Sequence, residues 1–581
     1  MLIFSRPRAI ALRVSLAAGL LSCLSLAGLS LPATAAPSPV LPVIGDWTSA
    51  SQSILGDRSQ PLEFSINPQD VGELAPKWVF TDHGDVSATP TVADGAVYFP
   101  DWGGYLNAVN AQTGALIWEH QISSYAGEQP NQVSRNSPLI DGNELVLGDN
   151  AGGPQPGGAH LFAVNRANGN LLWNTEIDTN PAAIVTSNPV AYGNEIVVGV
   201  ASNEEADAES PSYSCCSFRG AVVALNANTG QILWKTYTVP SNNQGGDSNI
   251  PCKSDNPAAG CGFTGGGVWA TPTIDPLTNQ VFVGTGNNYT ATDAAVACAN
   301  AALSADPPQS DANCTPANDY FDAVVALNLQ TGQIEWGHKV EGWDAWNVAC
   351  AVGFAPGATW CPSPASPDFD FGGGSPNLFI GRGPNGRLQT LVGDGQKSGV
   401  YWAFDPANGN IVWDTLVGPG TSLGGIEWGS AYDGQRIYTA EADFGGIPYQ
   451  LANNPATNCT NPSNGLPEWC GGSWAALNPQ TGAIEWQTAT PGGNVALGPV
   501  SEAGGVVFGA SMDPGPTDPD MFALDASTGK ILWSFDAGSS VNAGPAIVDG
   551  TVYWGSGYSH LGPFLPFTGN DKFYAFSLNG H

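Results

Sequence analysis

Cysteine is the residue type whose spacing most directly suggests chemistry in this chain. The sequence has 11 cysteines, and ten of them fall into five close pairs after residue 200. The pairs are Cys215/Cys216, Cys252/Cys261, Cys298/Cys314, Cys350/Cys361 and Cys459/Cys470. There is no C-x-x-C of the kind a thiolate metal site favours, and no C-x-x-C-H for covalent haem. We therefore predict five local disulfides, formed in an oxidising compartment, and no bound haem.

The charge balance is strongly acidic. The chain carries 51 Asp and Glu against 17 Lys and Arg, a formal net charge of −34. Such a field repels nucleic acid and anionic lipid, and it attracts cationic partners in a salt-dependent way. It excludes nucleic-acid binding, and it is compatible both with a cationic partner and with solubility alone.

The first 35 residues have the features of an export signal. Three arginines within the first 13 residues precede an apolar, Leu- and Ala-rich stretch, and Ala33-Thr34-Ala35 is a small-x-small cleavage site. No later segment approaches the 18 apolar residues of a membrane span. We predict a signal peptide over 1–35, an N-terminal extension over 36–60 and a soluble periplasmic or secreted protein. A lipid anchor at Cys23 remains the alternative.

Composition and repeats predict the fold that must position any site. The chain has 74 Gly and 46 Pro with only 12% charged residues, which suits short strands joined by turns and excludes an all-helical protein. One pattern, Ala-apolar-Asn/Asp-x-x-Thr/Asn-Gly-x-x-x-Trp with small variations, recurs seven times. It occupies 108–118, 163–173, 224–234, 326–336, 403–413, 476–486 and 523–533. We interpret each copy as a strand, a tight turn closed by Gly, and a second strand ending in Trp.

Each repeat is preceded by another pair of strands, such as Ala88–Phe99, so one unit contains the four strands of a propeller blade. An eighth unit begins at Tyr574-Ala575-Phe576 but stops before any Trp. Pro76–Phe80 is a lone Trp strand near the other end of the chain. We predict an all-β, eight-bladed β-propeller over 61–581, closed by this N-terminal strand in the last blade. A seven-bladed ring or two stacked half-rings are the alternatives.

The connections between repeats differ greatly in length. Successive Trp residues of the repeat are separated by 40 to 102 residues, and the longer intervals contain all five cysteine pairs. Long stapled loops on a rigid ring are where a site would be built. A short Ala-rich stretch, Ala294–Ala302, is a candidate helix within one of them.

The repeat resembles the tryptophan-docking repeat of the pyrroloquinoline quinone (PQQ) dependent quinoprotein alcohol dehydrogenases, over nearly the whole mature chain. Within that family the chain is most similar to the polyvinyl-alcohol dehydrogenases, through Gly267–Thr290 and Cys215–Trp234. The resemblance implies an eight-bladed propeller that holds PQQ and Ca²⁺ near its axis. Outer-membrane assembly scaffolds share the repeat without a cofactor, so a scaffold that binds protein partners is the alternative function.

The resemblance also implies a cofactor and metal site. Trp269 matches the family's stacking Trp, and Asn287, eighteen residues later, matches its calcium-binding Asn. Glu204 and Glu205 follow a strand at 196–200, where the family has its calcium-binding Glu, and the sequence leaves open which of the two binds metal. Carboxylate and amide oxygens are the ligands that Ca²⁺ requires.

Two cations match positions that contact PQQ in the family. Arg135 matches the Arg that clamps a cofactor carboxylate, for which a guanidinium fork is suited. Lys397 matches the Arg or Lys that reaches the reactive quinone carbonyl. Glu427 and Trp428 lie in a segment that resembles another rim of the pocket. Less specific matches to cofactor-bonding stretches are Thr186, Ser187 and Ser202.

The adjacent cysteines depart from the pattern of the methanol-oxidising relatives. Those relatives hold a vicinal disulfide against PQQ, but they carry it one unit earlier than Cys215 and Cys216. We expect a vicinal disulfide that reaches the cofactor from a different loop. The alternatives are separate disulfides to other cysteines and a purely structural staple.

The general base is where the chain differs most from the family. The segment Trp343–Val348 aligns Asn347 with the catalytic Asp of the family, and an amide cannot accept the alcohol proton. Asp344 lies three residues earlier, and we predict that it takes this role beside the cation. Lanthanide-using relatives add an Asp two positions after the catalytic one. Ala349 occupies that position here, or Trp346 if Asp344 is the base, and either favours Ca²⁺.

The function implied by the resemblance is oxidation of an alcohol, secondary or polymeric, to a carbonyl with PQQ as hydride acceptor. Without a haem motif the electrons must pass to a separate acceptor, such as a cytochrome c with a basic face. The natural substrate, the acceptor and the oligomeric state are not determined by the sequence.

Overall fold

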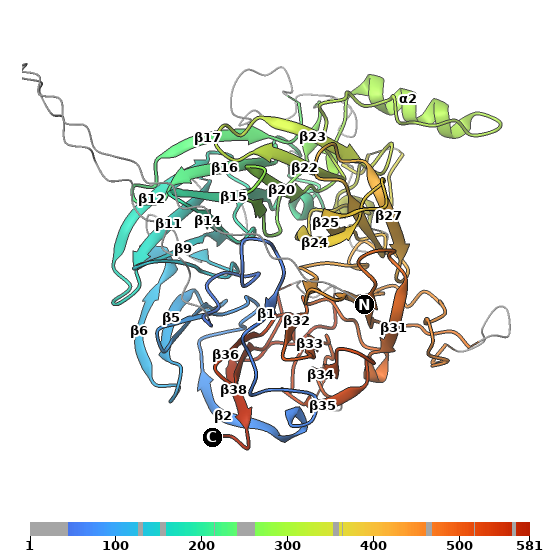
Figure 1. The fold of residues 1–581 in the computed structure, drawn as a ribbon. Coiled ribbons are helices and arrows are strands. Elements are labelled where there is room, and N and C mark those ends of the chain that lie inside the picture. Colours follow the sequence, from blue (N-terminus) through green and yellow to red (C-terminus); the bar gives the residue numbers. More distant parts are fainter. Residues whose placement is uncertain are drawn as a thin grey trace, which may run out of the picture. The chain divides into compact units, whose positions relative to one another are not determined.

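Each sequence repeat forms one four-stranded antiparallel sheet, and eight such sheets succeed one another as the blades of a β-propeller (Figure 1). The fold predicted from the repeat is confirmed. The computed structural model describes residues 45–125, 132–151, 158–213, 215–240, 262–351, 360–362, 364–459, 467–515, 518–560 and 565–581. All of them belong to one unit, Pro42–His581.

The strands of each blade are given from the innermost outwards. The first four blades contain β3 (Thr91–Ala93), β4 (Ala96–Pro100), β5 (Tyr105–Asn110) and β6 (Leu116–Gln121); β8 (Leu139–Asp141), β9 (Glu144–Gly148), β11 (Ala159–Asn165) and β12 (Leu171–Asp178); β14 (Val190–Tyr192), β15 (Glu195–Ser202), β16 (Ala221–Asn226) and β17 (Ile232–Tyr237); β19 (Thr273–Asp275), β20 (Gln280–Gly284), β22 (Ala323–Asn328) and β23 (Ile334–Lys339).

The next four blades contain β24 (Asn377–Arg382), β25 (Leu388–Gly395), β26 (Val400–Phe404) and β27 (Ile411–Leu416); β28 (Ala431–Tyr432), β29 (Ile437–Glu441), β30 (Ser473–Leu477) and β31 (Ile484–Ala489); β32 (Ser501–Ala503), β33 (Val506–Ala510), β34 (Met521–Asp525) and β35 (Ile531–Phe535); β36 (Ala546–Val548), β37 (Thr551–Gly555), β38 (Lys572–Leu578) and β2 (Leu74–Thr81).

The remaining elements lie at the blade edges and in the loops. The short strands are β1 (Ser59–Gln60), β7 (Gln132–Val133), β10 (Asn150–Ala151), β13 (Ala183–Ile184), β18 (Thr264–Gly265) and β21 (Asn288–Thr290). The helices are α1 (Glu204–Asp207), α2 (Asp293–Ser304) and the 3-10 turns η1 (Val71–Glu73), η2 (Ile122–Ser124), η3 (Val348–Cys350) and η4 (Pro491–Gly493). The Ala-rich stretch therefore forms a helix, as expected. No helix among the described residues is long and apolar enough to span a membrane.

The ring closes through its N-terminal strand. β2 pairs antiparallel with β38, with Trp78 opposite Ala575 and Phe80 opposite Phe573. The last blade is thus completed by a strand from the other end of the described chain, as the sequence predicted. Closure removes an unpaired strand edge from the sheet that would otherwise be open.

The Gly and Trp of the repeat join neighbouring blades. Trp173 at the outer strand of one blade donates its indole N–H to the carbonyl of Ala227 in the next, over 3.0 Å. Gly230 in that turn has φ +68°, and a Cβ there would lie 2.4 Å from the Trp173 ring. Only glycine allows both the turn and the close approach. Trp118 makes the same bond to Arg166 O, at 3.0 Å.

Residues 45–60 run around the inner ends of the blades. Trp47 bridges Val92 in the first blade, Ile54 O accepts from the amide of Ile274, and β1 pairs in parallel with β32. In Figure 1 this segment, in blue, crosses the middle of the ring. It brings Arg58 to the axis, where the guanidinium is almost completely buried.

Four of the expected disulfides are present. Cys298–Cys314, Cys350–Cys361 and Cys459–Cys470 staple long loops, and Cys215 is bonded to Cys216. The adjacent pair therefore forms the expected vicinal disulfide, and the alternative of separate partners is excluded. Cys252 and Cys261 lie outside the described residues, as do the signal peptide and the first part of the N-terminal extension.

Candidate active site

The segments that precede the innermost strands all reach the axis at one end of the ring, and they carry most of the candidate residues. Arg135 precedes β8, Thr186 and Ser187 precede β14, Trp269 precedes β19, and Trp428 precedes β28. Each of these innermost strands follows a short bend in the chain. Residues far apart in the sequence therefore meet in one pocket.

Trp269 is held by two consecutive glycines. A Cβ on Gly372 would lie 2.0 Å from the indole nitrogen of Trp269, and one on Gly373 would lie 2.2 Å from its ring. Any other residue type there would displace the indole. Lys397 Nζ lies 5.3 Å from the centre of the Trp269 ring, and Trp428 packs edge-on against it at 5.0 Å. The indole thus forms an aromatic platform beneath an ammonium group.

Lys397 is surrounded by acids. Its Nζ donates to Asp368 Oδ2 at 3.0 Å and to Asp370 Oδ2 at 3.4 Å, and all three side chains are buried. Burial opposes the charge on Lys397, but the carboxylates of Asp368 and Asp370, with Glu205 and Glu427, raise its pKa well above the usual value. Lys397 is therefore held as an ammonium at any ordinary pH.

Asp344 belongs to the same acidic cluster. Burial raises the pKa of Asp344 to about 7, and the negative charge of Asp370 adds to this, while a hydrogen bond from Ser366 and the charge of Lys397 act in the opposite direction. Ser366 donates to its Oδ1, whereas its Oδ2 is buried without a partner. Asp344 thus interacts electrostatically with Lys397, although no hydrogen bond joins the two, and its predicted role as the general base stays a prediction.

The structure distinguishes the two adjacent glutamates at the start of α1. Glu204 accepts from the backbone amides of residues 217–218, at 2.7–2.8 Å, and from the hydroxyl of Tyr213 at 2.9 Å. Its oxygens are used to hold the loop that carries the adjacent cysteines. Glu205 instead interacts with Lys397, and burial raises the pKa of Glu205 to about 7. Glu205 is therefore the carboxylate that faces the pocket.

The structure also distinguishes the two candidate asparagines, Asn287 and Asn347, by their hydrogen bonds. Asn287 donates its backbone N–H to Asp370 Oδ2 at 3.3 Å and its amide nitrogen to backbone carbonyls, so its Oδ1 is left for a ligand. Asn347 uses its whole amide: Nδ2 donates to the carbonyls of Tyr289 and Trp360, and Oδ1 caps η3. Asn347 is a structural residue here.

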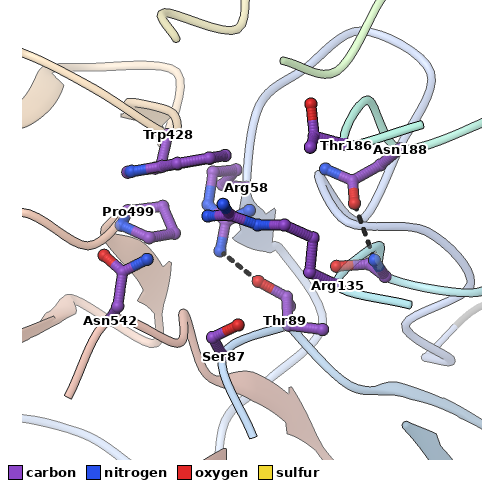
Figure 2. Close-up of a pocket in the computed structure, with 11 residues that line it drawn as sticks. Arg58, Ser87, Thr89, Arg135, Thr186, Asn188, Trp428, Pro499 and Asn542 are labelled. Carbon is purple, nitrogen blue, oxygen red and sulfur yellow. Dashed lines mark hydrogen bonds between the residues drawn. The ribbon is translucent and has the colours of Figure 1, made fainter. Parts of the chain in front are cut away.

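The opposite rim of the pocket carries Arg135. Its Nη2 donates to the Tyr558 hydroxyl at 3.0 Å, and its guanidinium lies 4.6 Å from the Trp428 ring centre (Figure 2). Neighbouring Glu427 is buried, its Oε1 has no partner, and burial raises the pKa of Glu427 to about 8. Among the described residues, no carboxylate is bonded to Arg135.

The three hydroxyl residues are placed beside the pocket, where they brace its walls. Thr186 donates to Trp269 O at 3.2 Å, and Ser187 donates to Ala270 O at 2.7 Å. Ser202, at the end of β15, accepts from the amide of Glu204 at 3.0 Å. These bonds fix the platform and the loop of the two glutamates.

The disulfide of Cys215 and Cys216 lies in a buried hydrophobic cluster that includes Phe218 and Tyr289, and Trp360 packs against this cluster. Tyr289 interacts electrostatically with Glu205, so the disulfide lies near the acidic cluster. The loop that carries it therefore borders the pocket from a different blade than Trp269.

Sequence reasoning missed Asp368 and Asp370. The short motif around Asn347 was aligned to the family's catalytic Asp, although a long loop separates Asn347 from the next innermost strand, β24. Asp370 lies six residues before Pro376, at the entry to β24. The candidate residues of the other blades lie just before an innermost strand. A search for acids at the same place before β24 could therefore have found Asp370.

The donor set fits both a flat anionic cofactor and a hard cation. Five acids surround one lysine, and buried carboxylate oxygens of Asp344, Asp368 and Glu427 have no hydrogen-bond partner. Unpaired buried carboxylates are costly unless a cation neutralises them. Within the described residues, no three His, Cys, Asp or Glu side chains form a metal cluster by themselves. A cation here would need the amide oxygen of Asn287 and ligand oxygens from a bound molecule.

Comparison with known proteins places the chain in a family. Residues 47–353 match the family model described as the PQQ glucose/ethanol/alcohol dehydrogenase β-propeller domain. The chain belongs to the PQQ-dependent quinoprotein alcohol dehydrogenase family. Residues 471–577 also match the model of the outer membrane protein assembly factor BamB, which shares the repeat.

Individual relatives cover most of this quinoprotein. It is 30% identical to a polyvinylalcohol dehydrogenase of Sphingopyxis sp. (strain 113P3), over 94% of this chain and 79% of the relative. It is 29% identical to a polyvinylalcohol dehydrogenase of Pseudomonas sp., over 88% and 73%. The quinohemoprotein alcohol dehydrogenase of Comamonas testosteroni has the same fold, with a TM-score of 0.62 at 19% identity, covering 92% of this chain and 81% of that one.

Proposed function

We propose that this quinoprotein oxidises secondary or polymeric alcohols to carbonyl compounds, with PQQ and Ca²⁺ in the axial pocket. The observation that carries the proposal is the pair formed by Lys397 and Asp370 above the Trp269 platform. Asp370 is the proton acceptor, Lys397 is the fixed cation and Trp269 is the aromatic surface, and the three lie together. The two relatives named polyvinylalcohol dehydrogenase support a polymeric alcohol as substrate.

The residues that would hold PQQ are Trp269, on which its ring system would stack, and Arg135, whose guanidinium suits a carboxylate. When bound, PQQ supplies an o-quinone that accepts two electrons as hydride. Thr186 and Ser187 keep Trp269 and its neighbour in place through backbone bonds. Lys397 supplies a permanent positive charge on the platform.

The residues that would hold Ca²⁺ are Glu205, through its carboxylate, and Asn287, through its free Oδ1. Asp344 offers an unpartnered Oδ2 in the same cluster. Hard cations bind six to eight oxygens, so the cofactor or water would supply the remainder. With Asp370 as the base, the position two residues later, where a lanthanide user would have an Asp, is Gly372, which favours Ca²⁺.

We propose Asp370 as the general base, in place of the predicted Asp344. Asp370 contacts both Lys397 and the backbone of Asn287, which makes it the acid joined to both sides of the site. In this position its carboxylate would accept the hydroxyl proton as the C–H bond of the alcohol breaks. The proton passes to Asp370 and the electron pair leaves with the hydride.

The electrons must then leave the enzyme. The sequence has no haem motif, and a relative of Pseudomonas sp. is named lupanine 17-hydroxylase [cytochrome c]. A separate cytochrome c with a basic face suits a net charge of −34, and its association would weaken with salt. The leader-like N-terminus supports export to the periplasm or medium.

The test is reconstitution. The purified mature protein is titrated with PQQ in Ca²⁺ buffer, bound quinone absorbance is recorded, and dye-linked oxidation of polyvinyl alcohol is compared with that of simple secondary alcohols. Saturable binding with dye reduction is the expected result. Absence of quinone binding would overturn the proposal and return the chain to the scaffold class.

A further inference from the structure

Residues 45–60 form hydrogen bonds with the inner edges of the blades, in order around the ring. The innermost strands of the first, second, fourth, fifth, sixth and seventh blades each donate one amide to this segment, over 2.7–2.9 Å. The accepting carbonyls belong, in the same order, to Trp47, Thr48, Ile54, Leu55, Asp57 and Arg58. Gln60 reaches the eighth blade, where its Nε2 donates to Ile547 O at 3.3 Å. We call residues 45–60 the axial segment; it covers strand edges that would otherwise be unpaired.

The side chain of Arg58 joins the axial segment to two blades. Its Nε donates to Val500 O at 2.7 Å, and its Nη1 donates to Ala50 O at 2.5 Å. Its Nη2 donates to the hydroxyls of Thr89 and Ser501, at 3.2 and 3.1 Å. These acceptors lie in the axial segment itself, just before β3 in the first blade, and at the start of β32 in the seventh. A guanidinium has five N–H donors in one plane and can serve all four acceptors, whereas the ammonium of lysine has three.

The stem of Arg58 also packs against the residue that follows Trp428. A Cβ built on Gly429 would lie 3.0 Å from Arg58 Cδ, so the two residues are in close contact. Val500, whose carbonyl accepts from Arg58, donates its own amide to Gly429 O at 3.3 Å. Arg58 therefore supports the backbone at Gly429 both directly and through Val500. Arg58 and Trp428 line the same small cavity (Figure 2).

Trp428 has a backbone conformation that needs such support. Its φ is +63°, in a region that bulky residues rarely adopt, so the conformation persists only where the surrounding structure holds it. The amide of Trp428 donates to Gly373 O at 2.6 Å, which fixes one side. The Trp428 ring centre lies 5.0 Å from that of Trp269 and 4.6 Å from the guanidinium carbon of Arg135. A shift of Trp428 would therefore alter the packing of both groups that the proposed function assigns to PQQ.

We propose that Arg58 is a positioning residue of the active site, carried to the pocket by the axial segment. It keeps Trp428 in place, and Trp428 in turn supports the indole of Trp269 and the guanidinium of Arg135. The effect on Trp428 is a property of the protein alone. The effect on cofactor affinity rests on the proposed function.

The first test observes Trp428 in the protein without PQQ. The chain is labelled with 5-fluorotryptophan, and the fluorine resonance of Trp428 is assigned by its loss in Trp428→Phe. Arg58→Met keeps most of the stem but removes every donor, so we expect the Trp428 resonance to shift or broaden. Trp47→Phe is the control, because it opens a cavity at a fully buried residue of the same segment and should lower the Tm without changing this resonance. An unchanged Trp428 resonance in Arg58→Met, or an equal change in both variants, would overturn the proposal.

Arg58 can also be displaced from its other side, which keeps the test valid if Arg58→Met does not fold. Gly544→Ala would place a Cβ 2.2 Å from Arg58 Nη2. Gly381→Ala is the matched control, because its Cβ would lie 2.5 Å from Leu391 Cδ1, a contact of similar severity that does not involve Arg58. We expect only Gly544→Ala to change the Trp428 resonance. The same Trp428 resonance in both variants would refute the role of Arg58.

The second test measures the Kd of PQQ by quinone absorbance in Ca²⁺ buffer. We expect Arg58→Met to raise the Kd about tenfold, and Trp47→Phe to leave it within about twofold. Arg58→Lys keeps the stem beside Gly429 and a donor for Val500 O, so its Kd should stay within about threefold of that of the unaltered protein. Equal Kd values for Arg58→Met and Trp47→Phe would overturn the proposal. If the unaltered protein itself binds no PQQ, the proposed function fails, and the fluorine spectra still decide whether Arg58 positions Trp428.

Discussion

The assignment of the general base gives the sharpest prediction. Replacing Asp370 by Asn keeps the size of the side chain and the acceptor for the amide of Asn287, 3.3 Å away. It removes the proton acceptor and the charge 3.4 Å from Lys397 Nζ. Loss of a positioned general base costs about 10²–10⁴ in rate, which corresponds to about 3–5 kcal/mol of activation free energy. We therefore expect kcat to fall by this factor.

Two matched variants separate catalysis from electrostatics. Asp368→Asn removes the shorter salt bridge to Lys397, 3.0 Å long, and leaves the bond between Asp370 and Asn287 intact. Asp344→Asn removes the acid that the sequence alone favoured. For both we expect a decrease in kcat of about tenfold or less, because neither side chain bridges the lysine and Asn287.

The assay is dye-linked alcohol oxidation by protein loaded with PQQ and Ca²⁺, with quinone absorbance recorded for each variant to establish cofactor occupancy. If Asp370→Asn keeps more than a tenth of kcat at full occupancy while Asp344→Asn loses more than a hundredfold, the reasoning is refuted. Asp344 would then be the base. Equal losses in all three variants would indicate that the cluster acts only through its total charge.

Three further predictions follow from the same contacts. Gly372→Ala should weaken PQQ binding at least tenfold in an absorbance titration, because its Cβ would lie 2.0 Å from the indole of the platform; Gly72→Ala, whose Cβ would meet nothing closer than 3.6 Å, should not. Glu205→Gln should raise the Ca²⁺ concentration needed for half-maximal activity by about 10–100-fold. Glu204→Gln should leave that concentration unchanged but lower the free energy of unfolding by about 1–3 kcal/mol. Without Ca²⁺, thermal stability should fall as pH rises from about 4 to 7, because the raised pKa of Asp344 means that the folded state binds more protons than the unfolded chain. Added Ca²⁺ should flatten this dependence, and a rise in stability over the same range would contradict it.

The fold could be predicted because its determinants are local and repeated. The Gly of the turn and the Trp of the outer strand both lie within one eleven-residue repeat. The contact between Trp173 and Gly230 shows that the Trp of one repeat also packs against the Gly of the next blade. The closing strand was visible because the two incomplete repeats at the ends of the chain complement each other. Pairing of Trp78 with the strand containing Ala575 follows from that complementarity.

The site was only partly predictable, because its members come from different blades. Trp269, Arg135 and Lys397 were named because the short motifs around them resemble cofactor-contacting motifs of the family. Glu204 and Glu205 could not be separated, because the backbone amides that engage Glu204 come from a loop thirteen residues later. Asp370 was overlooked because the loop before β24 has no counterpart in the aligned motif around Asn347.

The acidic composition illustrates why a count of charges is insufficient. In the sequence, a net charge of −34 is compatible with solubility alone. In the structure, Asp344, Asp368, Asp370 and Glu427 are almost fully buried around one lysine, which can balance only one of them. Solubility does not explain buried carboxylates, whose ionisation is unfavourable without a compensating charge. Their placement therefore requires either shared protons or a bound cation, and the proposed Ca²⁺ supplies the second in the pocket where the reaction needs it.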